Sequence, residues 1–388
     1  MFDAVVIGGG PSGASAAYHL ARGGAKVALV ERHSPRGESG PLVLLGALAQ
    51  DCLHGMGLAE WALEHGCTAP LVLHGPGGGQ VTVPETALPR PPLLVPREGL
   101  RLALLEAAAG RGVQLFCPAE ALAIRNEQGR ARVALRQGAI EARLALLAEG
   151  SGGWFSSALG LANAGPQCTA LLVLGSAPGM PAAAQYFFLP GILPSPAFLL
   201  TASGAFAAGL FAHGNRAVAR GAERLPSLLE QFGLQSAQAP SHLPLRTSFG
   251  GTREYAERLL VVGDAAQLAH PLTQLGIGPA LESGRIAAQH ALYALEKGRF
   301  AAKDLSAYRR ALRWRFGVEY RLASFARAML HSGRVLDRLI GRAERDEAFA
   351  RMLAGIIAGT QSVAGALTPA TLSRYLTWWR APGRRRRT

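Results

Sequence analysis

A glycine-rich turn between a buried strand and a helix constrains this chain more than any other feature. The apolar run 4–7 precedes Gly8-Gly9-Gly10-Pro11-Ser12-Gly13, and an alanine-rich run follows, which predicts a strand, a turn and a helix in that order. Gly8, Gly10 and Gly13 occupy the three positions of the G-x-G-x-x-G pattern. In that pattern the first glycine makes the turn, the second admits a pyrophosphate, and the third lets the helix pack on the strand.

A second strand and an acidic residue complete a dinucleotide-binding unit. Residues 26–30 predict the strand, and Glu31 follows it, 18 residues after Gly13. A carboxylate at this place accepts hydrogen bonds from the adenosine ribose, while the free N–H groups of the helix N-terminus bind the phosphates. We therefore expect the dinucleotide to contact the following residues: Gly8, Gly10, Pro11, Ser12, Gly13, Glu31 and Arg32.

A second motif far along the chain distinguishes FAD from NAD. Residues 258–262 predict a strand that leads into Gly263-Asp264-Ala265-Ala266, and His270-Pro271 precedes the glycine turn Gly276-Ile277-Gly278. With the first motif, this pattern resembles the flavoprotein superfamily of p-hydroxybenzoate hydroxylase, which includes flavin halogenases and geranylgeranyl reductases. The resemblance implies FAD as the cofactor. Gly263 and Asp264 would then bind the ribityl chain, and Pro271 with Gly276, Ile277 and Gly278 would lie beside the isoalloxazine ring.

Three intermediate segments extend this resemblance. Glu38 and Ser39 are similar to the Gly-Glu-Ser loop of halogenase-type members, which borders the flavin, and Arg97 opens a helix where the superfamily places an arginine near FAD. Glu149 replaces the Asp of the Ala-Asp-Gly motif that serves FAD and NADPH in the hydroxylases. No second nucleotide fold is evident, so we expect either NAD(P)H use without a dedicated domain or reduction by a partner flavin reductase.

The fold class expected is α/β, with a Rossmann-type FAD-binding domain interleaved with a mostly antiparallel substrate sheet, plus a helical C-terminal region. Residues 165–250 predict consecutive strands without intervening helices, and the glycines 75–79 predict a β-turn between two strands. The expected segments are FAD-binding at 1–68, 96–164 and 251–298, substrate sheet at 69–95 and 165–250, and the helical region at 299–388.

The positive charge is concentrated in the C-terminal region. Residues 299–388 hold 19 Lys+Arg and 6 Asp+Glu, a net of +13 out of +14 for the whole chain. Apolar residues from Leu305 to Ala323 recur every three or four positions, which predicts a helix. Trp378 and Trp379 precede the cluster Arg384–Arg387. That ending suits a lipid headgroup region or an acidic partner surface, and also a solvated tail. No nucleic-acid recognition module accompanies the charge, so we expect no nucleic-acid partner.

Other features favour a cytoplasmic protein, with peripheral contact at the inner face of the membrane left open. No apolar stretch reaches the roughly 20 residues of a membrane span, and no basic leader precedes the first strand. The four cysteines are scattered, which fits a reducing compartment, and neither they nor the ten histidines show metal-ligand spacing. We expect no metal site.

The sequence leaves several reactions open. Halogenation is disfavoured, because halogenases carry a catalytic lysine and this chain has none between Lys26 and Lys297. Glu38-Ser39-Gly40 stands where archaeal-type geranylgeranyl reductases carry Cys-Gly-Gly. The main expectation is therefore an FAD-dependent monooxygenase that hydroxylates an apolar or aromatic substrate, including one presented by another protein. The alternatives are saturation of a prenyl chain and a non-catalytic flavin-binding role. His270 is the one candidate catalytic residue, as proton donor or oxygen-site residue.

Overall fold

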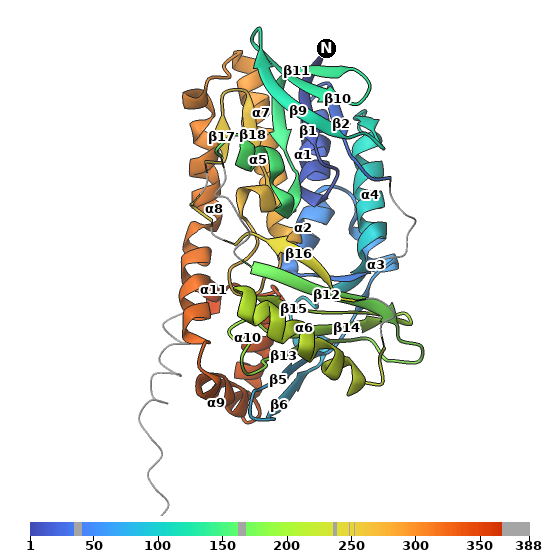
Figure 1. Cartoon of the computed structure of the whole chain (residues 1–388), viewed down its shortest axis with the longest axis vertical. Coiled ribbons are helices and arrows are strands. Elements are labelled where there is room, and N and C mark those ends of the chain that lie inside the picture. Colours follow the sequence, from blue (N-terminus) through green and yellow to red (C-terminus); the bar gives the residue numbers. More distant parts are fainter. Residues whose placement is uncertain (35–40, 162–167, 236–238, 248, 252, 367–388) are drawn as a thin grey trace, which may run out of the picture.

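The computed structural model describes residues 1–34, 41–161, 168–235, 239–247, 249–251 and 253–366. Their strands form three sheets. The two larger sheets occupy two regions of the molecule, and one long helix runs along both regions (Figure 1). The predicted α/β class is confirmed. The Glu38–Ser39 loop, the tryptophans Trp378 and Trp379 and the arginine cluster lie outside the described residues.

The first sheet carries the nucleotide-binding strands in a parallel core. Its order is β17 (Tyr255–Ala256), β18 (Leu259–Val261), β11 (Ala139–Leu147), β1 (Phe2–Ile7), β2 (Val27–Val30) and β8 (Gln114–Phe116), and a hairpin of β9 (Ala121–Glu127) and β10 (Arg130–Leu135) pairs with β11. Strands β18, β11, β1, β2 and β8 are parallel. Strands β2 and β18 and the carboxyl-terminal halves of β1 and β11 are buried, as expected for strands covered on both faces, whereas β8 at the edge of the sheet has no buried residue. The carboxyl ends of β1, β2 and β18 therefore meet at one edge.

The second sheet is antiparallel apart from one pair. Its order is β16 (Ser241–Leu245), β12 (Cys168–Ser176), β15 (Ala205–Ala212), β14 (Ala197–Ala202), β13 (Ala183–Phe187), β5 (Leu71–His74) and β6 (Gln80–Val83), with β13 and β5 parallel. The glycines 75–79 form the predicted turn between β5 and β6, closed by the bond from Gly75 N–H to the Gly79 carbonyl. A small third sheet of β3 (Leu42–Leu45), β7 (Leu93–Pro96) and β4 (Cys67–Thr68) lies between the two larger ones.

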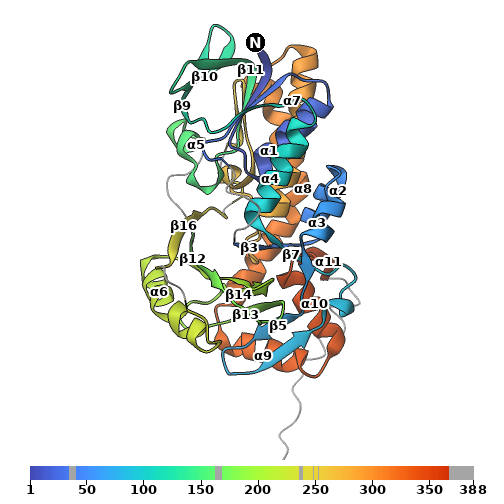
Figure 2. The same ribbon diagram turned by 90° about the vertical axis from the view of Figure 1, so that its right-hand side faces the viewer.

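Helices cover both large sheets. Their bounds are α1 (Pro11–Arg22), α2 (Ala47–Gly55), α3 (Ala59–Glu64), α4 (Arg97–Ala109), α5 (Trp154–Ala158), α6 (Asn215–Glu230), α7 (Ile277–Lys297), α8 (Ala302–Met329), α9 (Gly333–Ala343), α10 (Glu347–Ile357) and α11 (Val363–Ala366). The expectation of strands alone at 165–250 was wrong, because α6 interrupts them and packs Leu225, Leu228 and Leu229 on one face of the second sheet (Figure 2). Helices α9 and α10 pack on its other face.

The predicted C-terminal helix is confirmed as α8. Its buried residues are the ones that the three-and-four spacing indicated: Leu305, Tyr308, Leu312, Phe316, Tyr320 and Ala323. Two of them anchor the helix to the second motif, since the Tyr308 hydroxyl donates to the Val261 carbonyl and the Tyr320 hydroxyl donates to the Leu268 carbonyl. Among the described residues no helix is both long and apolar enough to cross a membrane.

Candidate functional site

The first glycine motif forms a turn that only glycine can make at two of its positions. Gly8 follows β1 with φ +108°, and a Cβ there would lie 2.2 Å from the carbonyl oxygen of Ala148. A Cβ on Gly13 would lie 1.9 Å from the Gly8 carbonyl oxygen. Both contacts are far inside van der Waals distance. The first and third glycines of the motif therefore allow helix α1 to pack directly against the ends of β1 and β11.

The second glycine leaves open space at the helix N-terminus. A Cβ on Gly10 would meet no atom within 4 Å, although Gly10 is the N-cap of α1. Pro11 stands at the first helical position, and no side chain of the described residues caps the backbone N–H groups of the first turn. Uncapped N–H groups beside open space bind anions, because the helix dipole adds a partial positive charge there. The turn fits the pyrophosphate of FAD.

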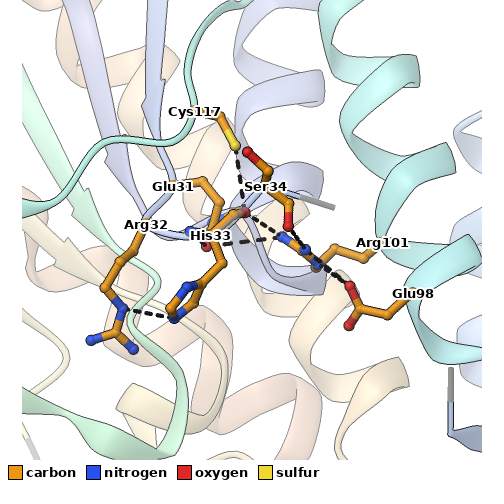
Figure 3. A network of polar contacts seen from close by, with 8 residues as sticks. Glu31, Arg32, His33, Ser34, Glu98, Arg101 and Cys117 are labelled. Atoms are coloured by element: carbon orange, nitrogen blue, oxygen red, sulfur yellow. Dashed lines mark hydrogen bonds and ion pairs between the residues drawn. The ribbon is translucent and has the colours of Figure 1, made fainter. Parts of the chain in front are cut away.

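Glu31 is fixed beside this turn at the end of β2. Its Oε2 accepts a hydrogen bond from the Gly9 N–H at 2.6 Å, and its Oε1 accepts one from the His33 N–H at 2.8 Å. Arg101 of α4 holds the following loop by donating to the carbonyls of His33 and Ser34 (Figure 3). In a dinucleotide-binding unit, a carboxylate at this position accepts hydrogen bonds from the ribose. Arg32 is exposed, and its Nε contacts the ring of the neighbouring His33.

The structure brings the second motif into contact with the first. Gly263, with φ +64°, is so close to α1 that a Cβ there would lie 2.6 Å from Ser12 Oγ. Helix α7 packs equally closely, since a Cβ on Gly284 would lie 2.3 Å from the Ser12 carbonyl oxygen. The Ser15 hydroxyl also donates to the Leu281 carbonyl at 2.7 Å. Segments far apart in the sequence therefore form one site.

Asp264 supplies a buried acceptor that has no partner among the described residues. Its Oδ1 is inaccessible to solvent and accepts no hydrogen bond there, and a Cβ on Gly276 would lie 3.2 Å from it. Burial raises the pKa of this carboxyl to about 6, and the positive charge of Arg97 opposes the rise. An unpaired buried carboxylate costs free energy unless a donor reaches it. The hydroxyl groups of a ribityl chain are such donors, so this residue fits FAD.

The turn before α7 separates two cavities. Pro271 is buried, Gln274 has φ +61°, and Gly276 is the N-cap of α7, which begins at Ile277. Gly278 packs on α2, where a Cβ would lie 3.0 Å from the Ala49 N–H nitrogen. Because α7 has no side-chain cap, its first N–H groups stay available for the negative charge of a reduced flavin.

One of these cavities, of about 230 Å³, lies between the turn and the second sheet. Its walls from β3 and the second sheet are apolar or aromatic: Leu42, Leu44, Leu171, Tyr186, Phe198, Leu200, Phe211 and Leu243. Arg97, Thr273 and Gln274 line the opposite side. Burial raises the pKa of the Tyr186 phenol, which therefore stays protonated at ordinary pH. This arrangement places a largely apolar surface beside the flavin-binding turn.

His270 lies at the second cavity, of about 250 Å³, and not at the apolar one. Its Nε2 is 3.2 Å from Glu319 Oε1, and its Nδ1 accepts from the Thr273 N–H at 3.2 Å. Glu319 also accepts the N–H groups of Val363 and Ala364 at the start of α11. Since both ring nitrogens are engaged, the geometry favours a positioning role, in which His270 ties the flavin-binding turn to α8.

We expect His270→Ala to leave FAD bound but to slow turnover by about 10- to 100-fold, because a shift of the turn misplaces the reacting groups. The measurement is kcat together with the absorbance spectrum of the bound flavin, which a displaced turn would shift. Thr273→Ala, which removes the hydroxyl that lies 3.1 Å from the ring Nδ1, should reproduce the spectral shift in weaker form. Unchanged turnover and spectrum in His270→Ala would dismiss any role of this residue.

Other predicted positions have local roles or lie outside the described residues. The Glu149 carboxylate accepts the N–H groups of Phe155 and Ser156 at 2.7 Å each, so it caps α5. No group of three His, Cys, Asp or Glu side chains within the described ranges could hold a metal ion. Sequence reasoning named neither Tyr186 nor Gln274 as an individual site residue, and it left the aromatic segment 185–190 open between a pocket wall and a packed strand. The alternation along β13, which sends Tyr186 and Phe187 to opposite faces, could have indicated the first.

Comparison with known proteins supports FAD binding. Residues 1–188 match the family model of an FAD binding domain. The digeranylgeranylglycerophospholipid reductase 2 of Methanothermobacter thermautotrophicus is 30% identical over 335 residues, which cover 81% of this chain and 83% of that protein. A geranylgeranyl bacteriochlorophyll reductase-like protein from Thermoplasma acidophilum shares the fold, with a TM-score of 0.76 at 21% identity over 97% of this chain and 98% of that one. So does a probable FAD-dependent monooxygenase from Pseudomonas aeruginosa, with a TM-score of 0.66 at 18% identity over 86% of this chain and 97% of the other.

Proposed function

Since this chain belongs to the family of FAD-dependent oxidoreductases that contains the digeranylgeranylglycerophospholipid reductases, we propose that it saturates carbon–carbon double bonds in the isoprenoid chain of a lipid. The observation that carries the proposal is the apolar cavity beside the flavin-binding turn. The named activity of the curated relatives supports the same reaction. Hydroxylation, the main expectation from the sequence, is thereby placed second.

The apolar lining favours an uncharged chain over a polar substrate. The sheet side of the cavity presents leucines, phenylalanines and the ring of Tyr186, and none of its side chains carries a charge. A prenyl chain gains about 0.8 kcal/mol for each CH₂ group that it buries on such surfaces. A polar substrate would leave its own groups without hydrogen-bond partners there. Burial of CH₂ groups on this lining therefore favours a hydrocarbon chain over a polar substrate.

Saturation of an alkene needs a hydride on one carbon and a proton on the other. FAD, when reduced and bound, supplies the hydride. Gly10 and Asp264 would hold the cofactor, and a side chain at the cavity would provide the proton. Tyr186 is the ionisable side chain on the sheet side of the cavity, and its phenol is kept protonated by burial. We propose that it donates the proton and is reprotonated from solvent.

Tyr186→Phe is therefore expected to lower the rate of double-bond reduction by about 100-fold, within the range of general acid catalysis. FAD affinity should not change, because Tyr186 lies on the sheet and not on either glycine motif. The measurement is single-turnover reoxidation of the reduced protein by substrate under anaerobic conditions. Phe198→Leu, which alters the neighbouring wall without removing an acid, serves as the control. Equal rates in Tyr186→Phe and the native protein would assign the proton to water.

The electron donor is proposed to be NAD(P)H or a partner flavin reductase. The described residues contain no second nucleotide-binding fold beside the one that fits FAD. Anaerobic mixing of the FAD-loaded protein with NADH and with NADPH separates the two options, since a fast loss of the oxidised flavin absorbance shows direct reduction. No reduction by either nucleotide would favour a partner reductase.

The decisive experiment supplies the reduced protein with a geranylgeranyl-bearing phospholipid in detergent, first without oxygen and then in air. Mass spectrometry should show the gain of two hydrogen atoms for each double bond, with no oxygen requirement. Incorporation of one oxygen atom with oxygen consumption would instead establish a monooxygenase. FAD binding without turnover under either condition would indicate a non-catalytic flavoprotein.

A further inference from the structure

The solvent-facing side of α8 carries no acidic residue. Helix α8 runs along one edge of the molecule and spans both regions (Figure 1). Its two acids point elsewhere, since Asp304 caps the N-terminus through the Ala301 N–H and Glu319 is bonded to His270 and α11. A long surface helix normally mixes both signs of charge. The outer side of α8 departs from that rule.

Large apolar side chains follow this outer side in a row. The exposed fraction of Trp314 is 87%, of Val318 56%, of Phe325 67% and of Met329 50%. Their spacing of four, seven and four residues puts them on one face of the helix, and we call these four residues the α8 stripe. At 1.5 Å per residue the stripe is about 22 Å long. Contiguous exposed apolar surface of this kind marks an interaction site.

Arginines flank the stripe without carboxylate partners. Arg310, Arg313 and Arg321 are exposed, and none of them forms an ion pair within the described part of the chain. Two other arginines of the same helix differ, because Arg309 pairs with Glu254, and Arg315, although its side chain is 38% exposed, pairs with Glu282. These two charges neutralise carboxylates of the fold, whereas those of Arg310, Arg313 and Arg321 remain available to an external anion.

We propose that the outer side of α8 docks on a bilayer surface that contains anionic lipid headgroups. Arginines beside exposed tryptophan and phenylalanine are typical of helices that lie in the membrane interface, where the apolar side chains enter the acyl boundary and the basic residues are attracted to anionic lipid headgroups. The charge is complementary, because the region 299–388 carries 19 Lys+Arg and 6 Asp+Glu.

The purpose of this docking rests on the proposed function, because docking would bring the reductase to its lipid substrate. Arg315, Phe316, Glu319 and Tyr320 of α8 line the second cavity, which shares Leu44, Thr273, Leu275 and Ile277 with the apolar cavity. A protein that lies with α8 on the bilayer would hold both cavities beside its lipid substrate. Binding to vesicles does not depend on catalysis, so the two ideas can be tested separately.

The test compares sedimentation of the full chain with vesicles of pure phosphatidylcholine and with vesicles that contain about one third phosphatidylglycerol. The native protein should bind only the anionic vesicles, and salt should weaken the binding. Arg313→Glu/Arg321→Glu and Trp314→Ala/Phe325→Ala should each weaken it by about tenfold or more. The matched controls are Arg125→Glu on β9 and Trp154→Ala on α5, whose exposed side chains lie on other elements. They should bind as the native protein does.

Native-like binding by the α8 variants would overturn the proposal and assign the contact to another surface. Binding of the native protein to polyglutamate or DNA, without binding to anionic vesicles, would overturn it in favour of an acidic macromolecule. Reduction of detergent-solubilised lipid should be unchanged in the α8 variants. Vesicle binding without any reductase activity would refute the proposed function alone, and activity without α8-dependent vesicle binding would refute the docking alone.

Discussion

Gly13→Ala is expected to abolish FAD binding and to destabilise the protein by about 3 kcal/mol, the upper part of the range for overpacking. The new Cβ would lie 1.9 Å from the Gly8 carbonyl oxygen and 2.9 Å from the Ala148 side chain, so α1 must move away from the sheet. Both effects have one cause, because the phosphate site is made by the N-terminus of α1. The measurements are urea unfolding without FAD and FAD titration by flavin fluorescence.

Gly10→Ala is the matched variant in the same turn. Gly10 has φ −74°, which any residue adopts, and its Cβ would meet no protein atom within 4 Å. Stability should stay within about 0.5 kcal/mol of the native value. FAD affinity should fall by about tenfold or more, since the methyl group would occupy the space that we assign to the pyrophosphate. Native FAD affinity in Gly10→Ala would show that the phosphate does not bind at this turn.

Asp264→Asn should stabilise the FAD-free protein at pH 7 by about 2 to 3 kcal/mol and should weaken FAD binding. The pKa of the buried carboxyl is about 6 in the folded protein, against a usual value of 3.8. At a pH between 3.8 and about 6, the Asp264 carboxyl keeps its proton in the folded state but has lost it in the unfolded state. The stability that the Asp264 proton contributes is therefore fully present below about pH 4 and is lost as the pH rises through 6.

The measurement is urea unfolding of the FAD-free protein between pH 4 and pH 8. The difference between Asp264→Asn and the native protein should be small near pH 4 and should grow until about pH 7, because the asparagine carries no charge. Glu64→Gln on α3, which changes an exposed carboxyl, should leave the native pH dependence in place. A parallel pH profile in Asp264→Asn would mean that this carboxyl is not the source of the effect.

The nucleotide-binding half of the site could be predicted from sequence because its determinants are local. The steric need for glycine at positions 8 and 13, and the carboxylate after a strand, each depend on a few consecutive residues. The buried residues of α8 could also be predicted, because a helix that packs on one side has apolar residues at every third or fourth position. Helix α6 was missed although Leu225, Leu228 and Leu229 show the same spacing, because the surrounding segments are strands.

The substrate cavity could not be predicted in the same way. Its walls come from β3, β12, β13, β14, β15, β16 and the turn before α7, and no short segment contains more than a few of its residues. A leucine in any of these strands looks like a core residue until the sheet is placed opposite the turn. His270 illustrates the same limit, because proximity to Pro271 in sequence did not reveal that its ring faces Glu319. The reaction was therefore less accessible than the cofactor.

The contact between Ser12 and Gly284 has a consequence for the order of events during synthesis. Helix α1 is made early, yet its partner α7 and the buried acceptor Asp264 are translated much later. A nascent chain that ends before residue 284 has the glycine turn but no closed flavin site. FAD would therefore bind only after most of the polypeptide has been synthesised and has left the ribosome. A fragment limited to residues 1–188, the part matched by the family model, should be unable to retain FAD.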